Sequence, residues 1–174
     1  MTLTLYRIAK QQYAQSPDLP EHGVGAARFG GRWNSADPAL NFDRRIIYAS
    51  DTLAQAMLEV LVHVDPRVLR TVPHVFVRFQ VESDAIAQLD VQNLPPTWNA
   101  LPETAATQVI GDQWYDEKVA PVLRVPSAPL PLSVYWLGQS NYLINARHPD
   151  VQRAVQLLGT EPLPFDARLT QHNN

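Results

Sequence analysis

Hydrophobic positions along the chain follow two periodicities, which together predict a mixed α and β fold. Residues 3–9 and 46–49 are apolar on both faces if extended, and therefore predict strands of a sheet that is covered on both sides. Residues 74–81 alternate apolar and polar side chains, which indicates a half-buried strand. Residues 122–127 and 132–137 are the remaining predicted strands.

Helical spacing of apolar residues occurs in three other ranges. Residues 53–64 follow a capping segment and precede Pro66, so a helix is predicted between these two signals. A second helical region is expected over residues 103–120, with an interruption near Gly111. A third, amphipathic helix is predicted over residues 149–158.

Length and composition indicate a single domain spanning residues 1–174. The chain has 174 residues, 45% of them hydrophobic and 18% charged, which is typical of an ordinary globular protein. No period of 20 to 50 residues is found in the chain, which gives no sign of a repeat architecture. We therefore expect one α/β domain.

Several classes of function are disfavoured by what the sequence lacks. The chain contains no cysteine, which excludes disulfides, thiolate metal sites and a cysteine nucleophile, and its histidines show no metal-binding spacing. The net charge of −3 argues against a broadly cationic nucleic-acid surface. The sequence shows neither a signal peptide nor an apolar run of membrane-spanning length, so we expect a cytoplasmic protein without a metal.

A glycine-rich segment, GVGAARFGGRWN at residues 23–34, is the first candidate ligand-binding feature. It lacks the GxxxxGK[ST] pattern and a complete GxGxxG, and the residues before it do not form a strand, so P-loop and Rossmann sites are excluded. The segment can still approach a ligand closely and carries Arg28 and Arg32. The alternative is a surface loop whose glycines serve only turns.

The predicted helix over residues 53–64 carries one narrow polar stripe formed by Gln55, Glu59 and His63. Glu59 is the centre of that stripe and is framed by apolar neighbours. The stripe is either the solvent-facing edge of the helix or the wall of a cleft.

Three further residues have a polar group in a predicted apolar setting. Arg7 shares its strand face with leucines, so its charge must meet either an internal acid such as Glu59 or a bound anion. Tyr48 ends a predicted strand and either packs in the core or presents its ring to a flat ligand. Ser127 lies outside any GxSxG pattern, so a serine-hydrolase interpretation has no support.

Taken together, these segments resemble the RES-domain family. The resemblance is carried by LYRI, GVGAARFGGRWN, IIYAS, LAQAMLEVLVH, VLRVPSAPLP, NYLIN and PFDARL, and it covers about residues 4–169. Family resemblance implies a fold like the ADP-ribosyltransferase core of diphtheria-type toxins. It also implies a toxin whose antitoxin partner is an Xre-like helix-turn-helix protein.

The resemblance further implies roles for individual residues. Arg7 and Arg32 would bind the dinucleotide NAD⁺, with Tyr48 against its nicotinamide ring. Glu59 would be the acidic centre, and Ser127 would be a further site residue. Asn141 and Asn145 also match a family motif, but the resemblance assigns them no role.

The expected activity is consumption of NAD⁺ by cleavage of its nicotinamide–ribose bond, through hydrolysis or phosphorolysis. The leaving nicotinamide needs no proton, because its nitrogen is already cationic, so a single carboxylate suffices to stabilise the cationic ribose. One alternative is mono-ADP-ribosylation of a protein, and others are an RNA-targeting toxin or a non-catalytic binding module. The antitoxin is expected to occlude the cleft and to supply all nucleic-acid affinity.

Overall fold

The computed structural model of the protein describes residues 1–170, so the last four positions of the predicted domain lie outside it. It confirms the mixed α/β class, with one seven-stranded sheet in the order β4-β5-β6-β2-β1-β3-β7. The strands are β1 (Thr2–Lys10), β2 (Ile46–Ser50), β3 (His74–Glu82), β4 (Ile86–Gln88), β5 (Val122–Val125), β6 (Asn141–Asn145) and β7 (Val155–Pro162). The helices are α1 (Val24–Phe29), α2 (Leu53–His63), α3 (Pro66–Thr71), α4 (Ala105–Glu117), α5 (Val151–Ala154) and α6 (Ala167–Thr170).

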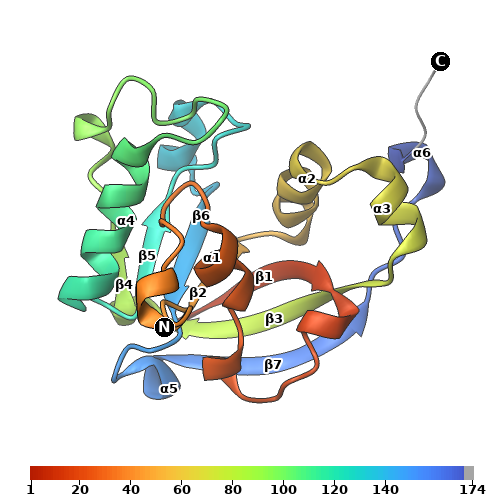
Figure 1. The fold of residues 1–174 in the computed structure, drawn as a ribbon, viewed down its shortest axis with the longest axis horizontal. Coiled ribbons are helices and arrows are strands. Elements are labelled where there is room, and N and C mark those ends of the chain that lie inside the picture. The colour runs from red at the N-terminus through yellow and green to blue at the C-terminus, as the bar shows by residue number, and fades with distance from the viewer. Residues whose placement is uncertain (171–174) are drawn as a thin grey trace.

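The sheet consists of two halves that diverge between β1 and β2. β1 pairs with β3 along its whole length, from Thr2–Glu82 to Lys10–His74, whereas it meets β2 at Tyr6–Ser50. In Figure 1, β1, β3 and β7 run across the view while β5 and β6 run upright, with α4 beside the upright half and α2 beyond β1. The point of divergence therefore creates space between two groups of strands.

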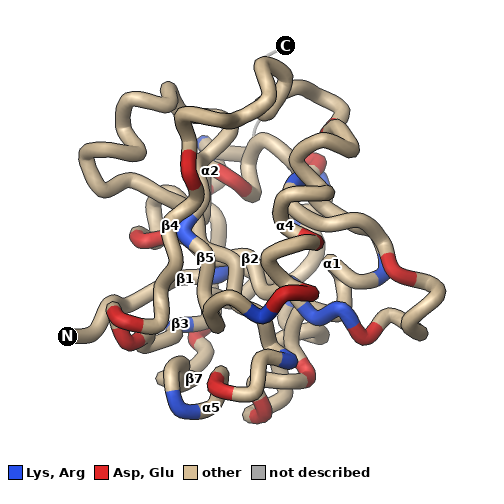
Figure 2. The backbone as a smooth tube through the Cα atoms, turned by 90° about the vertical axis from the view of Figure 1, so that its left-hand side faces the viewer, with Lys and Arg blue, Asp and Glu red and all other residues tan. Residues whose placement is uncertain are grey.

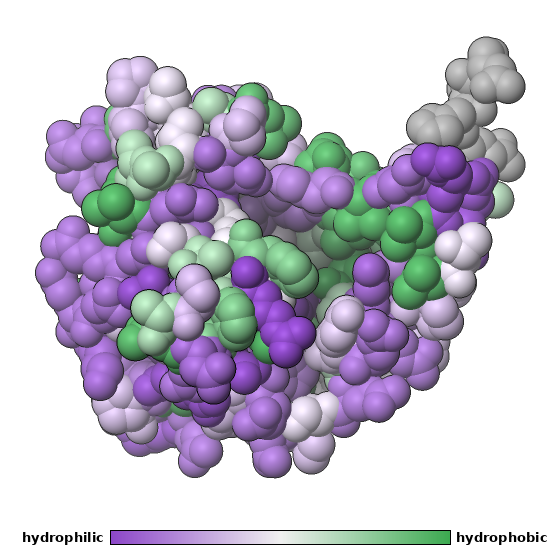
Figure 3. All heavy atoms as spheres, viewed as in Figure 1, coloured by the Kyte–Doolittle hydropathy of each residue, from purple (hydrophilic) through white to green (hydrophobic). Residues whose placement is uncertain are grey.

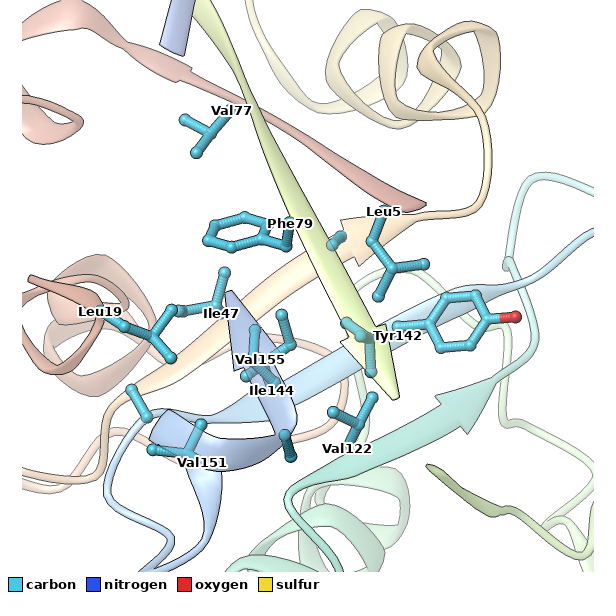
Figure 4. Packing of buried hydrophobic residues seen from close by; sticks show 14 of the residues in the cluster. Leu5, Leu19, Ile47, Val77, Phe79, Val122, Tyr142, Ile144, Val151 and Val155 are labelled. Atoms are coloured by element: carbon cyan, nitrogen blue, oxygen red, sulfur yellow. The ribbon is translucent and has the colours of Figure 1, made fainter. Parts of the chain in front are cut away.

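Two apolar clusters stabilise these halves. The larger cluster combines inward residues of β1, β2, β3, β6 and β7, among them Leu5, Ile47 and Phe79 (Figure 4). The second cluster packs α4 and the glycine-rich segment against β2, β5 and β6, and includes Trp33 and Trp114. Removal of this apolar surface from water is the main stabilising contribution to the fold.

The predicted strand over residues 132–137 was wrong, because this segment forms a 3₁₀ helix over Leu132–Leu137. Pro131 precedes it, and Gly138 ends it in the left-handed region with φ of 93°. The turn buries the Tyr135 ring under the Arg124 guanidinium, 4.3 Å from the ring centroid. Tertiary contacts of one aromatic residue thus outweigh a local alternation of apolar side chains.

The predicted amphipathic helix over residues 149–158 was also wrong in its second half. Helix α5 ends at Ala154, and the chain continues as edge strand β7, paired antiparallel with β3. Val155 and Leu157 face the larger core cluster from this strand. Their spacing of two suits a strand as well as a helix, and the unpaired edge of β3 decides between the two.

Other elements refine the expected pattern. The helix predicted over residues 53–64 is confirmed as α2, and α3 follows with Asp65 as its N-cap. The glycine-rich segment contains the short helix α1, flanked by Gly23 and Gly30 at positive φ. Strand β6, at the centre of its half of the sheet, was not predicted. In the described part of the chain no helix is long and apolar enough to cross a membrane.

Gly111 lies within α4 and does not interrupt it. A Cβ atom built at this position would lie 1.8 Å from the carbonyl oxygen of Trp33. The glycine therefore allows the backbone of the glycine-rich segment to lie directly against α4. This contact fixes the position of the Trp33 backbone relative to α4, and with it the position of the neighbouring Arg32.

We expect Gly111→Ala to lower the free energy of unfolding by about 1–3 kcal/mol, because the added methyl group meets backbone that cannot move aside. The measurement is urea unfolding followed by circular dichroism. Gly25→Ala is the matched control, since a Cβ atom at Gly25 meets nothing within 4 Å. Equal stability of the two variants would contradict the role given to Gly111.

Candidate functional site

A cleft of about 460 Å³ lies where the two halves of the sheet diverge. Its walls come from β1, β2, α2 and the glycine-rich segment, with Pro126 and Asn141 beside them. Figure 3 shows the surface hollowed between the part of the molecule that carries α1 and α4 and the part that carries α2 and α3. Four of the predicted site residues line this cleft, namely Arg7, Arg32, Tyr48 and Glu59.

Arg7 reaches the cleft from the middle of β1. Burial lowers the pKa of its guanidinium to about 10, because desolvation disfavours the charged form. No acidic side chain among residues 1–170 forms an ion pair with Arg7, so the alternative of a structural pair with Glu59 is not realised. A half-buried cation without an acid nearby suits the other alternative, a bound anion.

Arg32 is held by the chain on the opposite side of the cleft. Its Nη1 donates to the carbonyl oxygens of Trp98 at 2.8 Å and Ala100 at 3.1 Å. No other guanidinium nitrogen of Arg32 bonds to a described residue. Arg32 is only 9% exposed and lines the cleft, so with one nitrogen fixed the remaining face of the guanidinium is directed to the cleft.

Tyr48 presents its ring to the cleft while its hydroxyl is fixed behind it. The hydroxyl donates to Asn34 Oδ1 at 2.7 Å and accepts the backbone N–H of Trp33 at 3.1 Å. Burial raises the pKa of Tyr48, so the hydroxyl is a neutral anchor. Gly31 lies so close to the ring that a Cβ atom there would be 2.8 Å from the hydroxyl oxygen.

Glu59 lies on the side of α2 that faces β5 and β6. Its Oε1 accepts two hydrogen bonds, from Ser127 Oγ at 2.6 Å and from Asn141 Nδ2 at 2.5 Å. No described residue donates to Oε2 of Glu59. The carboxylate is thus anchored through one oxygen, and the other is available to a ligand in the cleft.

At Glu59, the polar stripe on α2 therefore forms a wall of the cleft and is not the solvent-facing edge of the helix. His63, one turn further, stands at the rim, with Nδ1 2.7 Å from the carbonyl oxygen of Glu59 and Nε2 4.0 Å from Glu103 Oε1. Glu103 also lines the cleft. Sequence reasoning missed Glu103, because it lies in a loop without a motif and only the tertiary structure brings it opposite α2.

Two candidates lie elsewhere. Arg28 is exposed and stacks over the Phe42 ring, 5.9 Å from its centroid. Asn145 is buried and supports the end of β6, where its side chain binds the carbonyl of Tyr115 and the N–H of Arg147. Asn141 differs from Asn145, since it touches Glu59 directly.

In the view of Figure 2, the described residues outside the cleft form no basic face. Lysine and arginine positions in Figure 2 are interspersed with aspartate and glutamate along the chain. Several of these form surface ion pairs, such as Arg147 with Asp43 and Arg44 with Asp116. This distribution suits a compact anionic ligand in the cleft better than a nucleic-acid backbone on the surface.

Comparison with known proteins places this geometry in context. A profile of the family described as RES domain matches residues 4–166. The chain is 31% identical to the protein named Toxin Res of Yersinia enterocolitica, over 96% of this chain and 99% of that protein. It is 33% identical to the Prs ADP-ribosylating toxin of a Sphingobium species, over 87% and 88% respectively.

A likeness of fold extends to one solved structure. A chain from the crystal structure of the M. tuberculosis MbcT–MbcA toxin–antitoxin complex superposes with a TM-score of 0.69 and 22% sequence identity. The match covers 94% of this chain and 85% of that chain. It confirms the fold class expected from the sequence.

We expect Arg7→Met to raise the free energy of unfolding at pH 7.5 by about 1 kcal/mol, because it removes a half-buried charge that lacks an acid partner among the described residues. Burial holds the folded-state pKa of Arg7 at about 10, below its ordinary value, so the destabilisation is present below about pH 10 and disappears as the pH rises further. Urea unfolding measures it. Pyrophosphate should raise the free energy of unfolding of the wild type more than that of Arg7→Met, which keeps only Arg32 as a cation in the cleft.

The control for this prediction is Arg28→Met, which removes an exposed arginine outside the cleft. Its stability should stay within about 0.5 kcal/mol of the wild type. A clear loss of stability in Arg7→Met would mean that Arg7 has a stabilising partner within the protein.

Proposed function

The chain belongs to the RES-domain family, and from this premise we propose that the protein is the toxin of a toxin–antitoxin pair and breaks the nicotinamide–ribose bond of NAD⁺. The names of its relatives support the toxin assignment. One observation carries the enzymatic part. The same cleft contains Arg7, a cation without an acid partner among residues 1–170, and Glu59, a carboxylate with one oxygen that no described residue bonds.

Binding of the dinucleotide follows from the charges of the cleft. Arg7 and the unbonded face of Arg32 bind the pyrophosphate by charge-assisted hydrogen bonds. The Tyr48 ring, whose hydroxyl is tied to Asn34, gives the nicotinamide a fixed flat surface. These contacts hold the bond to be broken next to Glu59.

Cleavage then requires stabilisation of positive charge rather than proton transfer to the leaving group. The C–N bond breaks with both electrons going to nicotinamide, which leaves as a neutral molecule, and the ribose becomes an oxocarbenium ion. Glu59 stabilises that cation, and its fixed Oε1 means that little reorganisation accompanies the reaction. Water adds to the ribose carbon and releases one proton to solvent, or phosphate takes the place of water.

A second candidate is transfer of ADP-ribose to a protein side chain. It is favoured by the name of the Sphingobium relative, which matches at 33% identity over most of both chains. Bond cleavage is the same in both reactions, and only the acceptor differs. ³²P from adenylate-labelled NAD⁺ becomes acid-precipitable only when a protein is the acceptor.

The decisive experiment measures cellular NAD⁺ after induced expression. We expect the wild type to deplete NAD⁺ and arrest growth, and Glu59→Gln to do neither, because the nearly isosteric amide keeps packing but loses the charge. Glu117→Gln, an exposed change on α4, is the matched control and should remain toxic. Toxicity of Glu59→Gln would refute the assignment, and unchanged NAD⁺ with the wild type would favour an RNA-targeting toxin or a binding module.

The partner we propose is an Xre-like helix-turn-helix antitoxin. An NAD⁺-consuming enzyme that is active in the cytoplasm harms its own cell. The protein product of a neighbouring gene must therefore inhibit it. A chain terminus or acidic side chain could fill the place of phosphate between Arg7 and Arg32. The DNA-binding part of the antitoxin then supplies the nucleic-acid affinity of the complex.

This occlusion predicts mutual exclusion of antitoxin and dinucleotide. Calorimetric titration of the toxin with antitoxin, at rising concentrations of a non-cleavable NAD⁺ analogue, should show a progressive loss of apparent affinity. Toxin alone should bind operator DNA no better than a generic acidic protein. Simultaneous binding without mutual weakening would replace occlusion by an allosteric mechanism.

A further inference from the structure

Gln55 is the buried member of the α2 polar stripe to which the proposed reaction gives no role. The residue is only 6% exposed and does not line the cleft. Its position is fixed, because its backbone N–H donates to Thr52 Oγ1 at the helix N-cap. A buried primary amide in an apolar helix is costly unless its hydrogen bonds are made.

The Gln55 amide is bonded to Asn141, which is the residue that binds Glu59. Gln55 Nε2 donates to Asn141 Oδ1 at 3.0 Å, and Ser50 Oγ donates to the same oxygen at 2.8 Å. The other end of the Asn141 amide, Nδ2, donates to Glu59 Oε1. Gln55 therefore reaches the carboxylate through one intermediate side chain.

The direction of this chain of hydrogen bonds is set by the Glu59 carboxylate, and the donors of Gln55 and Ser50 on Asn141 Oδ1 agree with that direction. An ionised Glu59 only accepts, so Asn141 must present its NH₂ group to Glu59 and its oxygen to Gln55. In the reversed arrangement the Asn141 oxygen would face Oε1, and two NH₂ groups would face each other. A reversed chain becomes favourable only if Glu59 is protonated and Gln55 turns its own oxygen toward Asn141.

We propose that Gln55 is a positioning residue that fixes which end of the Asn141 amide faces Glu59, and so maintains the arrangement that an ionised Glu59 requires. Ser50 supports it from β2. The inference deepens the proposed function, since it rests on Glu59 as the charge that stabilises the ribose cation.

The test is a double-mutant cycle between Gln55→Glu and Asn141→Ala. A glutamate at position 55 only accepts, so it turns the Asn141 NH₂ group away from Glu59. In the wild-type background we expect kcat for nicotinamide release to fall at least about tenfold with KM changed less than about threefold. In the Asn141→Ala background the same change should alter kcat by less than about threefold, because no amide remains to be turned.

The cycle separates the effect of the Asn141 amide orientation from the electrostatic effect of the carboxylate that Gln55→Glu adds. An added carboxylate acts on Glu59 electrostatically in both backgrounds, so an equal effect in the two would overturn the proposal. Gln55→Met removes one of the two donors and should lower kcat less than Gln55→Glu does. Gln113→Met is the matched control: Gln113 Nε2 donates to Glu117 on the exposed side of α4, and its loss should leave kcat unchanged.

Thermal unfolding of the same four proteins without NAD⁺ gives a readout that does not depend on the reaction. Gln55→Glu should lower Tm by at least about 3 °C more in the wild-type background than in the Asn141→Ala background. Asn141→Ser replaces Asn141→Ala if the latter fails to fold. If the wild type releases no nicotinamide, the proposed function fails, and additive Tm values would still refute the role of Gln55 independently.

Discussion

The divergence of β1 from β2 is the constraint on which the cleft depends. The two strands meet at Tyr6–Ser50, and beyond that point each follows its own half of the sheet. Were they paired along their length, the space between Arg7 and Tyr48 would be filled by a continuous sheet. Helix α2 follows β2 after a short turn, so the same divergence places Glu59 over the opening.

The polar side chains that line the cleft differ in whether they have hydrogen-bond or ion-pair partners within the protein. Tyr48 and Arg32 each have protein partners behind them, and Glu59 has two donors on one oxygen. Arg7 has no acid partner among the described residues. Since desolvation of an unpaired charge is unfavourable, this asymmetry is the reason for proposing that Arg7 binds an anion.

Close backbone approach is what gives the glycine-rich segment its place in the fold. Gly31 lies against the Tyr48 ring, and Gly111 of α4 admits the backbone of Trp33. These two contacts hold Arg32 from both sides. The segment therefore resembles a phosphate loop in its glycine content, and what it holds in place at the cleft is the Arg32 guanidinium.

The sequence by itself determined the elements whose signals are local. The apolar run of β2, the N-cap of α2 and the stripe with Glu59 at its centre all follow from spacing and capping chemistry. The resemblance to RES-domain proteins also singled out Ser127, which the structure joins to Glu59 by a hydrogen bond. Roles in a reaction remain proposals at each of these positions.

Only the tertiary structure decided the features that depend on contacts distant in sequence. β7 forms because β3 offers it an edge, residues 132–137 form a 3₁₀ helix because Tyr135 packs on Arg124, and Glu103 faces His63 across the cleft. No local pattern contains that information, since each outcome depends on a partner brought near by the rest of the fold. For the same reason the sequence places Gln55 only on a polar stripe, whereas the structure shows it buried and bonded to Asn141.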